Sequence, residues 1–231
     1  MKKLSVNINR ILLFAGIVSC LMLSCTTEDY ETGNGEYSFM RADFVETATD
    51  SQGAFVSAVT DEGEQLMFAS PFKVSWKTAS DSTYRALLYY QKKDGEVTPF
   101  TVSTVSVPTV RMTSSLKSAM KTDPVTLESI WQSKQNEYIN MGLLLKTGNP
   151  DESDNRHVVG MMCDTVYEHP DRYRHIRLRF YHDQHQMPEY YSSKVYVSIP
   201  MKKLPCTIAR GDTVTVAVNS YEGLREKSFV Y

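Results

Sequence analysis

The chain has 231 residues, with 25 Lys and Arg against 27 Asp and Glu, and a formal net charge of −2. It has no basic block, so nucleic-acid binding, which depends on a concentrated positive surface, is not expected. The 14 tyrosines, together with many Val and Thr residues, favour strands over helices. We therefore expect a mainly β protein of one or two domains.

The first 24 residues have the pattern of an export signal. Three basic residues flank an apolar run over residues 11–23, which is shorter than the roughly 20 residues that a transmembrane helix needs. The run ends in Leu-Ser-Cys25, which resembles the lipobox of bacterial lipoproteins, and residues 17–20 form a competing match. We expect residues 1–24 to be a lipoprotein signal peptide and Cys25 to be the lipid attachment site. A retained N-terminal anchor is the alternative.

A lipid on Cys25 predicts the partner and the compartment of the protein. Several acyl chains hold a protein firmly on a membrane, because each buried methylene contributes about 0.8 kcal/mol. Glu28-Asp29 resembles an export tag that sends some lipoproteins to the cell surface. We therefore expect attachment to the outer membrane of the cell envelope, with the protein facing either the periplasm or the cell surface. Residues 25–36 are poor in apolar side chains and predict a flexible tether.

Residues 37–112 predict a small OB-like β-barrel. Short strand-like runs alternate with turn signals at residues 50–53, 61–64 and 93–96. Five or six short strands suit a closed barrel, because closure removes exposed edges. The aromatic residues of this region either form an OB-type groove or pack inside the barrel: Trp76, Tyr84, Tyr89 and Tyr90.

Residues 113–122 predict a linker or a short helix, because Met112, Leu116 and Met120 recur at a spacing of four. From residue 123 to residue 231, apolar and polar residues alternate with a period of two, as in strands with one buried face. About seven such strands favour an immunoglobulin-like antiparallel β-sandwich.

Several segments resemble the NigD-like lipoprotein family: Asp123-Pro124-Val125, Glu137-Tyr138-Ile139-Asn140-Met141, Leu178-Arg179-Phe180-Tyr181-His182 and Gly211-Asp212-Thr213-Val214. The resemblance covers nearly the whole chain after the signal segment. It implies a lipid anchor, an N-terminal OB-like domain and a C-terminal β-sandwich. It implies no shared activity and no catalytic motif, and the family name comes from association with a bacteriocin gene cluster.

Arg177, Arg179 and Tyr181 are the predicted ligand-binding residues. They alternate along one strand and face away from the buried side, and arginine beside an aromatic ring suits carboxylates, phosphates or sugars. The ligand would be a glycan or a peptide. The alternative is a charged solvent face whose arginines pair with acids on neighbouring strands.

His182-Asp183-Gln184-His185 could hold a metal, but its spacing differs from the helical zinc pair of proteases. We expect no metal site and no cofactor, with His182 near the rim of the sandwich and His185 in solvent. Trp131 is expected in the sandwich core. Cys163 and Cys206 either form a disulfide or stay free.

No catalytic residue is predicted, because the chain has no nucleophile elbow, phosphate-binding loop, dinucleotide fingerprint or zinc-protease helix. The sequence favours a lipid-anchored, non-catalytic binding module of the cell envelope, with an immunity-like role suggested by the family name. The alternative is a glycan-active or metal-dependent envelope enzyme.

Overall fold

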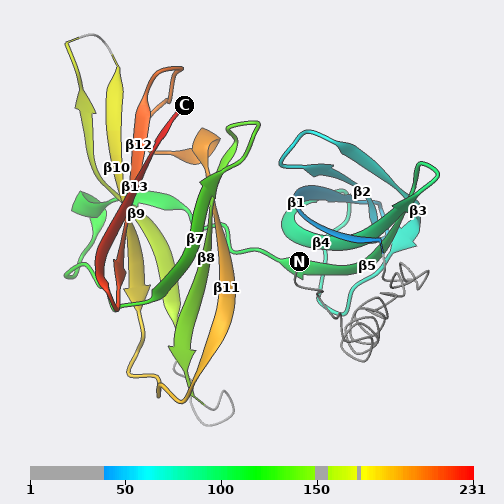
Figure 1. Cartoon of the computed structure of the whole chain (residues 1–231), viewed down its shortest axis with the longest axis horizontal. Helices are drawn as coiled ribbons and strands as arrows, with labels where there is room; N and C mark the ends of the chain where they lie inside the picture. The colour runs from blue at the N-terminus through cyan, green and yellow to red at the C-terminus, as the bar shows by residue number, and fades with distance from the viewer. Residues whose placement is uncertain (1–38, 149–155, 171–172) are drawn as a thin grey trace, which may run out of the picture. The chain divides into compact units, whose positions relative to one another are not determined.

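Figure 1 shows the computed structural model, which describes residues 39–148, 156–170 and 173–231. The strands of the described residues all lie in one compact unit, Met40–Tyr231. The predicted signal peptide, Cys25 and the predicted tether lie outside the described residues. Within the described ranges, no helix is long and apolar enough to cross a membrane.

The first five strands form a closed barrel in the order β1-β2-β3-β5-β4, which confirms the predicted OB-like barrel. Antiparallel pairing joins β1 to both β2 and β4, and a single parallel pair between Phe68 and Val97 joins β3 to β5. The strands are β1 (Met40–Thr49), β2 (Phe55–Thr60), β3 (Gln65–Phe72), β4 (Thr83–Lys93) and β5 (Glu96–Thr104).

The predicted turns connect these strands. Asp50 caps the β1–β2 turn, where its Oδ1 accepts backbone hydrogen bonds from Gln52 at 2.8 Å and Ala54 at 2.9 Å. Asp94 and Gly95 both have positive φ between β4 and β5, as a tight hairpin turn requires.

The aromatic residues of the barrel lie mostly inside it. Tyr90 is fully buried, and the Phe55, Trp76 and Tyr84 rings contact one another with centroids 5.4–5.7 Å apart. The indole N–H of Trp76 also donates to the backbone carbonyl of Val102 at 3.4 Å. The packing interpretation therefore holds for Trp76, Tyr84 and Tyr90.

Eight further strands form a β-sandwich, which confirms the predicted second module. One sheet has the order β13-β12-β10-β9-β6 and the other has the order β11-β8-β7. The strands are β6 (Val110–Met112), β7 (Thr126–Gln132), β8 (Tyr138–Thr147), β9 (Val158–Glu168), β10 (Arg174–Asp183), β11 (Tyr191–Pro200), β12 (Thr213–Ser220) and β13 (Gly223–Val230). Most pairs are antiparallel, but β10–β12 and β6–β9 are parallel.

The alternating residues of the sequence build one core between the two sheets. Ile139, Met141 and Leu143 from β8 are fully buried, and so are Ile176 and Leu178 from β10. Val214, Val216 and Val218 from β12 complete the same cluster. Burying each such side chain contributes about 1.5–3 kcal/mol, so the period-two pattern both predicts these strands and stabilises the sandwich.

At the start of the sandwich the structure differs from the sequence analysis in the position of the module boundary and in the segment that follows β6. β6 lies within the range expected for the barrel, but it pairs with β9, so the module boundary lies before β6. Of the two alternatives for residues 113–122, a linker or a short helix, the α-helix does not form: the segment contains the 3-10 turn η1 (Thr113–Ser115) and an isolated bridge from Thr122 to His182. The Ser115 hydroxyl bonds to the Met112 carbonyl, the kind of local bond that competes with helix formation, and the Thr113 hydroxyl bonds to Asp164 on β9.

Candidate functional site

The junction between the barrel and the sandwich is organised around Arg85 on β4. Its side chain is only 3% exposed, although arginine is rarely buried without a partner. Asp61, which directly follows β2, accepts two hydrogen bonds from the guanidinium, at 2.7 Å and 2.8 Å. This bidentate geometry is the strongest form of an arginine–carboxylate contact, and it neutralises the Arg85 charge.

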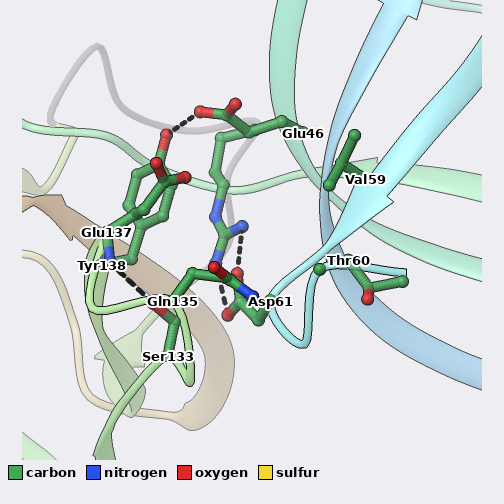
Figure 2. A pocket seen from close by; sticks show the side chains of 10 residues that line it. Glu46, Val59, Thr60, Asp61, Ser133, Gln135, Glu137 and Tyr138 are labelled. Carbon is green, nitrogen blue, oxygen red and sulfur yellow. Dashed lines mark hydrogen bonds and ion pairs between the residues drawn. The ribbon is translucent and has the colours of Figure 1, made fainter. Parts of the chain in front are cut away.

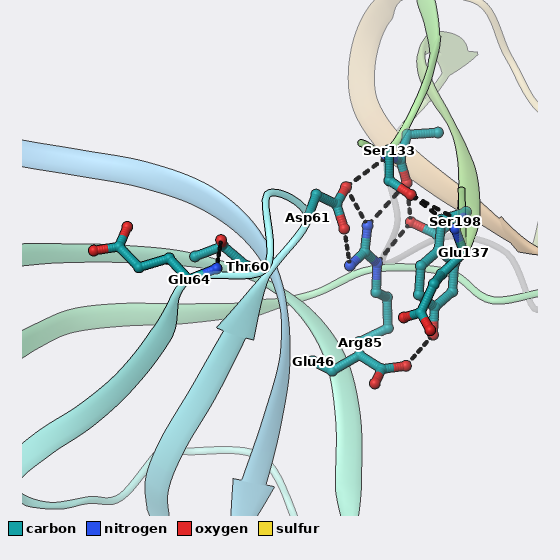
Figure 3. A network of polar contacts seen from close by, with 10 residues as sticks. Glu46, Thr60, Asp61, Glu64, Arg85, Ser133, Glu137 and Ser198 are labelled. Atoms are coloured by element: carbon teal, nitrogen blue, oxygen red, sulfur yellow. Dashed lines mark hydrogen bonds and ion pairs between the residues drawn. The ribbon is translucent and has the colours of Figure 1, made fainter. Parts of the chain in front are cut away.

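Two buried residues of the sandwich complete the network shown in Figure 3. Arg85 donates through Nε to Ser198 Oγ on β11 at 3.1 Å and through a terminal nitrogen to Asn140 Oδ1 on β8 at 3.0 Å. Asn140 in turn donates to Asp61 at 2.8 Å, and Ser198 donates to Asn140 at 2.6 Å. The Arg85 network, defined by Asp61, Arg85, Asn140 and Ser198, therefore bonds the two modules directly.

Aromatic rings cover the Arg85 network. The guanidinium carbon lies 4.0 Å from the centroid of Tyr138 and 5.5 Å from that of Phe44. Phe44 meets Trp131 and Tyr196 edge-to-face, with centroids 5.3 Å and 5.2 Å apart. Trp131 is half-buried against the barrel rather than in the sandwich core, which corrects the expectation for this residue.

A pocket of about 270 Å³ opens beside the network, and its lining residues come from both modules (Figure 2). Arg85 and Asp61 form part of its wall. The barrel also contributes Glu46, Val59, Thr60 and Gly63, and the β7–β8 turn with the start of β8 contributes Ser133, Gln135, Glu137 and Tyr138. We call this cavity the junction pocket.

Gly63, in the turn after β2, lies where the Gln135 side chain of the β7–β8 turn meets the barrel. Gly63 has a φ of +87°, and a Cβ atom there would lie 2.5 Å from Gln135 Nε2. Gln135 also donates to the Glu62 carbonyl at 3.3 Å. Ser133 Oγ accepts the backbone N–H groups of Glu137 and Tyr138, which fixes the turn at the pocket wall.

The polar atoms of the junction pocket are mostly hydrogen-bond acceptors. The Tyr138 hydroxyl donates to Glu46, and burial together with this bond raises the pKa of Tyr138. Glu137 pairs with the exposed Lys202. Of the three carboxylates in the lining, Asp61 pairs with Arg85 and Glu137 pairs with Lys202, whereas Glu46 accepts only the neutral Tyr138 hydroxyl and keeps its negative charge. The pocket is chemically suited to a ligand that donates hydrogen bonds or carries positive charge.

The predicted binding residues lie elsewhere, on the outer face of β10. Arg177 pairs with Glu226 and Arg179 pairs with Asp164, as the solvent-face interpretation predicts. Tyr181 lines a separate, more apolar pocket of about 390 Å³, together with Arg111 and Leu116. The three predicted residues share one face, but they do not converge on one cavity.

The histidines form a small buried contact. His182 is only 1% exposed, further inside than expected, whereas His185 is exposed as predicted. His182 Nδ1 donates to the Asp123 carbonyl at 2.9 Å, and His182 Nε2 shares a second hydrogen bond of 2.9 Å with His157 Nδ1. Within the described part of the chain, no three metal-ligating side chains lie together. Cys163 and Cys206 are both free.

Sequence reasoning missed Arg85, Asp61, Asn140 and Ser198. A weak signal existed, because Arg85 and Asn140 are polar residues within the strand-like runs Thr83–Gln91 and Tyr138–Leu145. Such a residue on a buried face needs a partner. The partners are 24 to 113 positions away in the chain, so they could not be identified before the fold was known.

Comparisons with solved structures support the same fold. The chain resembles a NigD-like immunity protein from Bacteroides caccae at 21% identity and a TM-score of 0.62, with 82% of this chain and 96% of that chain covered. It also resembles a candidate toxin-related protein from Parabacteroides distasonis (18%, TM-score 0.56, 83% and 93% covered) and a candidate lipoprotein from Bacteroides fragilis (14%, TM-score 0.56, 82% and 96% covered).

Among curated proteins, none matches the chain. Residues 108–231 match the family described as the NigD-like C-terminal beta sandwich domain. This match covers more than half of the chain and includes every strand of the sandwich. The chain therefore belongs to the NigD-like family.

Proposed function

We propose that the protein is held in the cell envelope by a lipid on Cys25 and binds a ligand in the junction pocket without transforming it. The observation that carries the binding role is a pocket whose walls come from both modules and are held together by the buried Arg85 network. A preformed concave site with a few oriented polar groups is the usual form of a ligand site.

The pairing of the charged groups favours recognition over catalysis. Arg85 and Asp61 neutralise each other, and the Tyr138 hydroxyl is bonded to Glu46. A nucleophile or general base needs a lone pair that the substrate can reach at a suitable pKa. Here the same groups hold the modules together. The acceptor-rich lining favours a cationic peptide segment as the ligand, with the hydroxyl groups of a glycan as the second choice.

The related structures suggest a biological setting. One is named an immunity protein, one a candidate toxin-related protein and one a candidate lipoprotein. The finer proposal is that the protein intercepts a peptide or protein toxin at the outer membrane. Deletion of the gene should then increase sensitivity to toxins of competing strains, and unchanged sensitivity would remove this finer form while leaving the binding role open to its own test.

The binding role is tested by NMR titration with lysine-rich peptides and neutral oligosaccharides as probes. Binding should shift the amide signals of Gly63, Gln135 and Glu137. Val59→Arg should weaken binding at least tenfold, because Val59 lines the pocket and is 43% exposed. Met67→Arg is the matched control, since Met67 is a 69% exposed barrel residue outside the pocket. Chemical turnover of a probe, or the absence of shifts with every probe, would contradict the proposal.

The anchor has a separate test. Intact mass measurement of the native protein should show a chain that begins at an acylated Cys25, and Cys25→Ala should release the protein from the membrane fraction. An unprocessed N-terminus without acyl chains would contradict this part of the proposal.

A further inference from the structure

The open edge of β11 has features that the junction pocket does not explain. β11 is the outermost strand of its sheet and pairs with β8 in unbroken antiparallel register from Tyr191 to Pro200. The edge of β11 opposite β8 is already paired at one point, where Ser106 forms an isolated parallel bridge with β11. Ser106 donates to the Tyr196 carbonyl at 3.1 Å and accepts from the Ser198 N–H at 2.8 Å, in parallel orientation.

This bridge identifies which backbone groups point away from β8. Backbone groups of alternate residues along a strand face the same edge, so Ser192 and Lys194 face the same way as Tyr196 and Ser198. Ser192 and Lys194 are exposed, and the described part of the chain supplies no backbone partner for them on this edge. The chain itself leaves the edge at Val105, whose N–H bonds to the Arg85 carbonyl on β4 at 3.3 Å.

A pocket of about 510 Å³ lies where the chain leaves the edge. Apolar and aromatic side chains supply much of its lining, from the barrel (Leu87, Tyr89 and Val105) and from β11 (Val195 and Tyr196). Lys194 also lines this pocket, and its Nζ bonds to Glu128 at 2.9 Å, across β8 on β7 and so on the side of the sheet away from the free edge. An open strand edge next to an apolar pocket is the arrangement by which proteins bind extended peptides as an added strand.

We propose that this edge binds an extended peptide segment of a partner protein. The peptide continues the strand position that Ser106 begins, its backbone bonds to Ser192 and Lys194, and one apolar side chain enters the pocket beside Tyr89. A peptide fits this edge better than a glycan for two reasons. A peptide backbone can continue the pairing that Ser106 makes, and its N–H and C=O groups have the same spacing as the free groups of β11. This site is separate from the junction pocket and does not depend on the function proposed for that pocket.

The test uses the capped peptide acetyl-Thr-Val-Thr-Leu-Thr-amide as the probe and amide hydrogen exchange as the readout. Bound peptide should slow exchange at Ser192 and Lys194 at least tenfold and leave Ser193, which already bonds to β8, unchanged. Ser192→Pro removes one outward N–H without removing a bond to β8, and proline is tolerated on a strand edge. It should weaken binding about fivefold to tenfold, the value of one hydrogen bond.

Tyr89→Ala tests the pocket, with Tyr167→Ala as the control, because Tyr167 is 57% exposed and lies outside the pocket. Only Tyr89→Ala should reduce the advantage of the leucine-containing peptide over its glycine analogue. Because backbone pairing depends little on peptide sequence, unchanged exchange at Ser192 and Lys194 in millimolar probe would overturn the proposal. Protection of both amides without peptide, together with dimerisation, would also overturn it and identify a second copy as the occupant.

Discussion

The arginines of the two modules show how differently the same side chain can act. Arg85 is nearly inaccessible and donates to Asp61, Asn140 and Ser198, which lie on three separate segments. Arg177 and Arg179 have side chains about 40% exposed, and each pairs with one acid on the same sheet. Buried pairs are costly to break, whereas exposed pairs contribute little. A cluster of arginines in a sequence is therefore a weaker sign of importance than one arginine inside an apolar strand.

Arg85→Met should have the largest effect on this comparison. The substitution leaves the Asp61 charge beside the buried Asn140 and Ser198 without its partner, which should lower the free energy of unfolding by about 3–5 kcal/mol. Urea denaturation measures the change. The double variant Arg85→Met with Asp61→Leu should recover much of the loss, because no unpaired charge remains. A single variant that is as stable as the wild type would refute the structural role of Arg85.

Gly63→Ala tests how closely the barrel must approach the β7–β8 turn. The positive φ alone should cost about 1 kcal/mol, and the contact with Gln135 should add to it. Gly95→Ala is the matched control, because Gly95 has a similar φ of +89° and open space around its Cβ position. The difference between the two variants in thermal denaturation isolates the contact. Equal losses would mean that Gln135 moves aside freely.

The contact between His157 and His182 is a further polar contact inside the molecule, and unlike the arginine pairs it can change its charge near neutral pH. Burial, followed by the nearby His182, lowers the pKa of His157 below the ordinary 6.5. The unfolded chain therefore binds a proton first as the pH falls below about 6.5, and the free energy of unfolding decreases, by at most about 1.4 kcal/mol per pH unit. At higher pH both states are neutral and the effect disappears.

Urea midpoints at pH 7.5 and 5.5 measure this dependence. His157→Gln should flatten it, and His169→Gln, which replaces an exposed histidine, should leave it unchanged. Glu64 does not interfere, because bonds from Lys92 and Arg41 lower its pKa from 4.5, so it titrates below this range. A steeper acid loss in the His157→Gln variant would contradict the assignment.

The sequence predicted the modules better than the site. Alternation such as Ile176, Leu178 and Phe180 reports burial directly, because side chains on a strand alternate between its faces. The alternation could not predict that β10 pairs parallel with β12, because the same alternating pattern occurs in parallel and in antiparallel strands. Nor could it predict the junction, where Arg85 meets Ser198 across 113 positions. Contacts of this kind depend on how two modules meet, and local pattern contains no information about that.

Arg177→Ala should have the smallest effect and completes the comparison with Arg85. The exposed pair with Glu226 should contribute between 0 and about 1 kcal/mol, because water and salt screen it. The same urea measurement at low and high salt should show a small loss that disappears at high salt. Glu226→Ala is the matched partner variant, and the double variant should be no less stable than either single variant. A loss of several kcal/mol that persists in salt would mean that the outer face of β10 has a structural role comparable to that of the junction, and the contrast between the two arginine environments would fail.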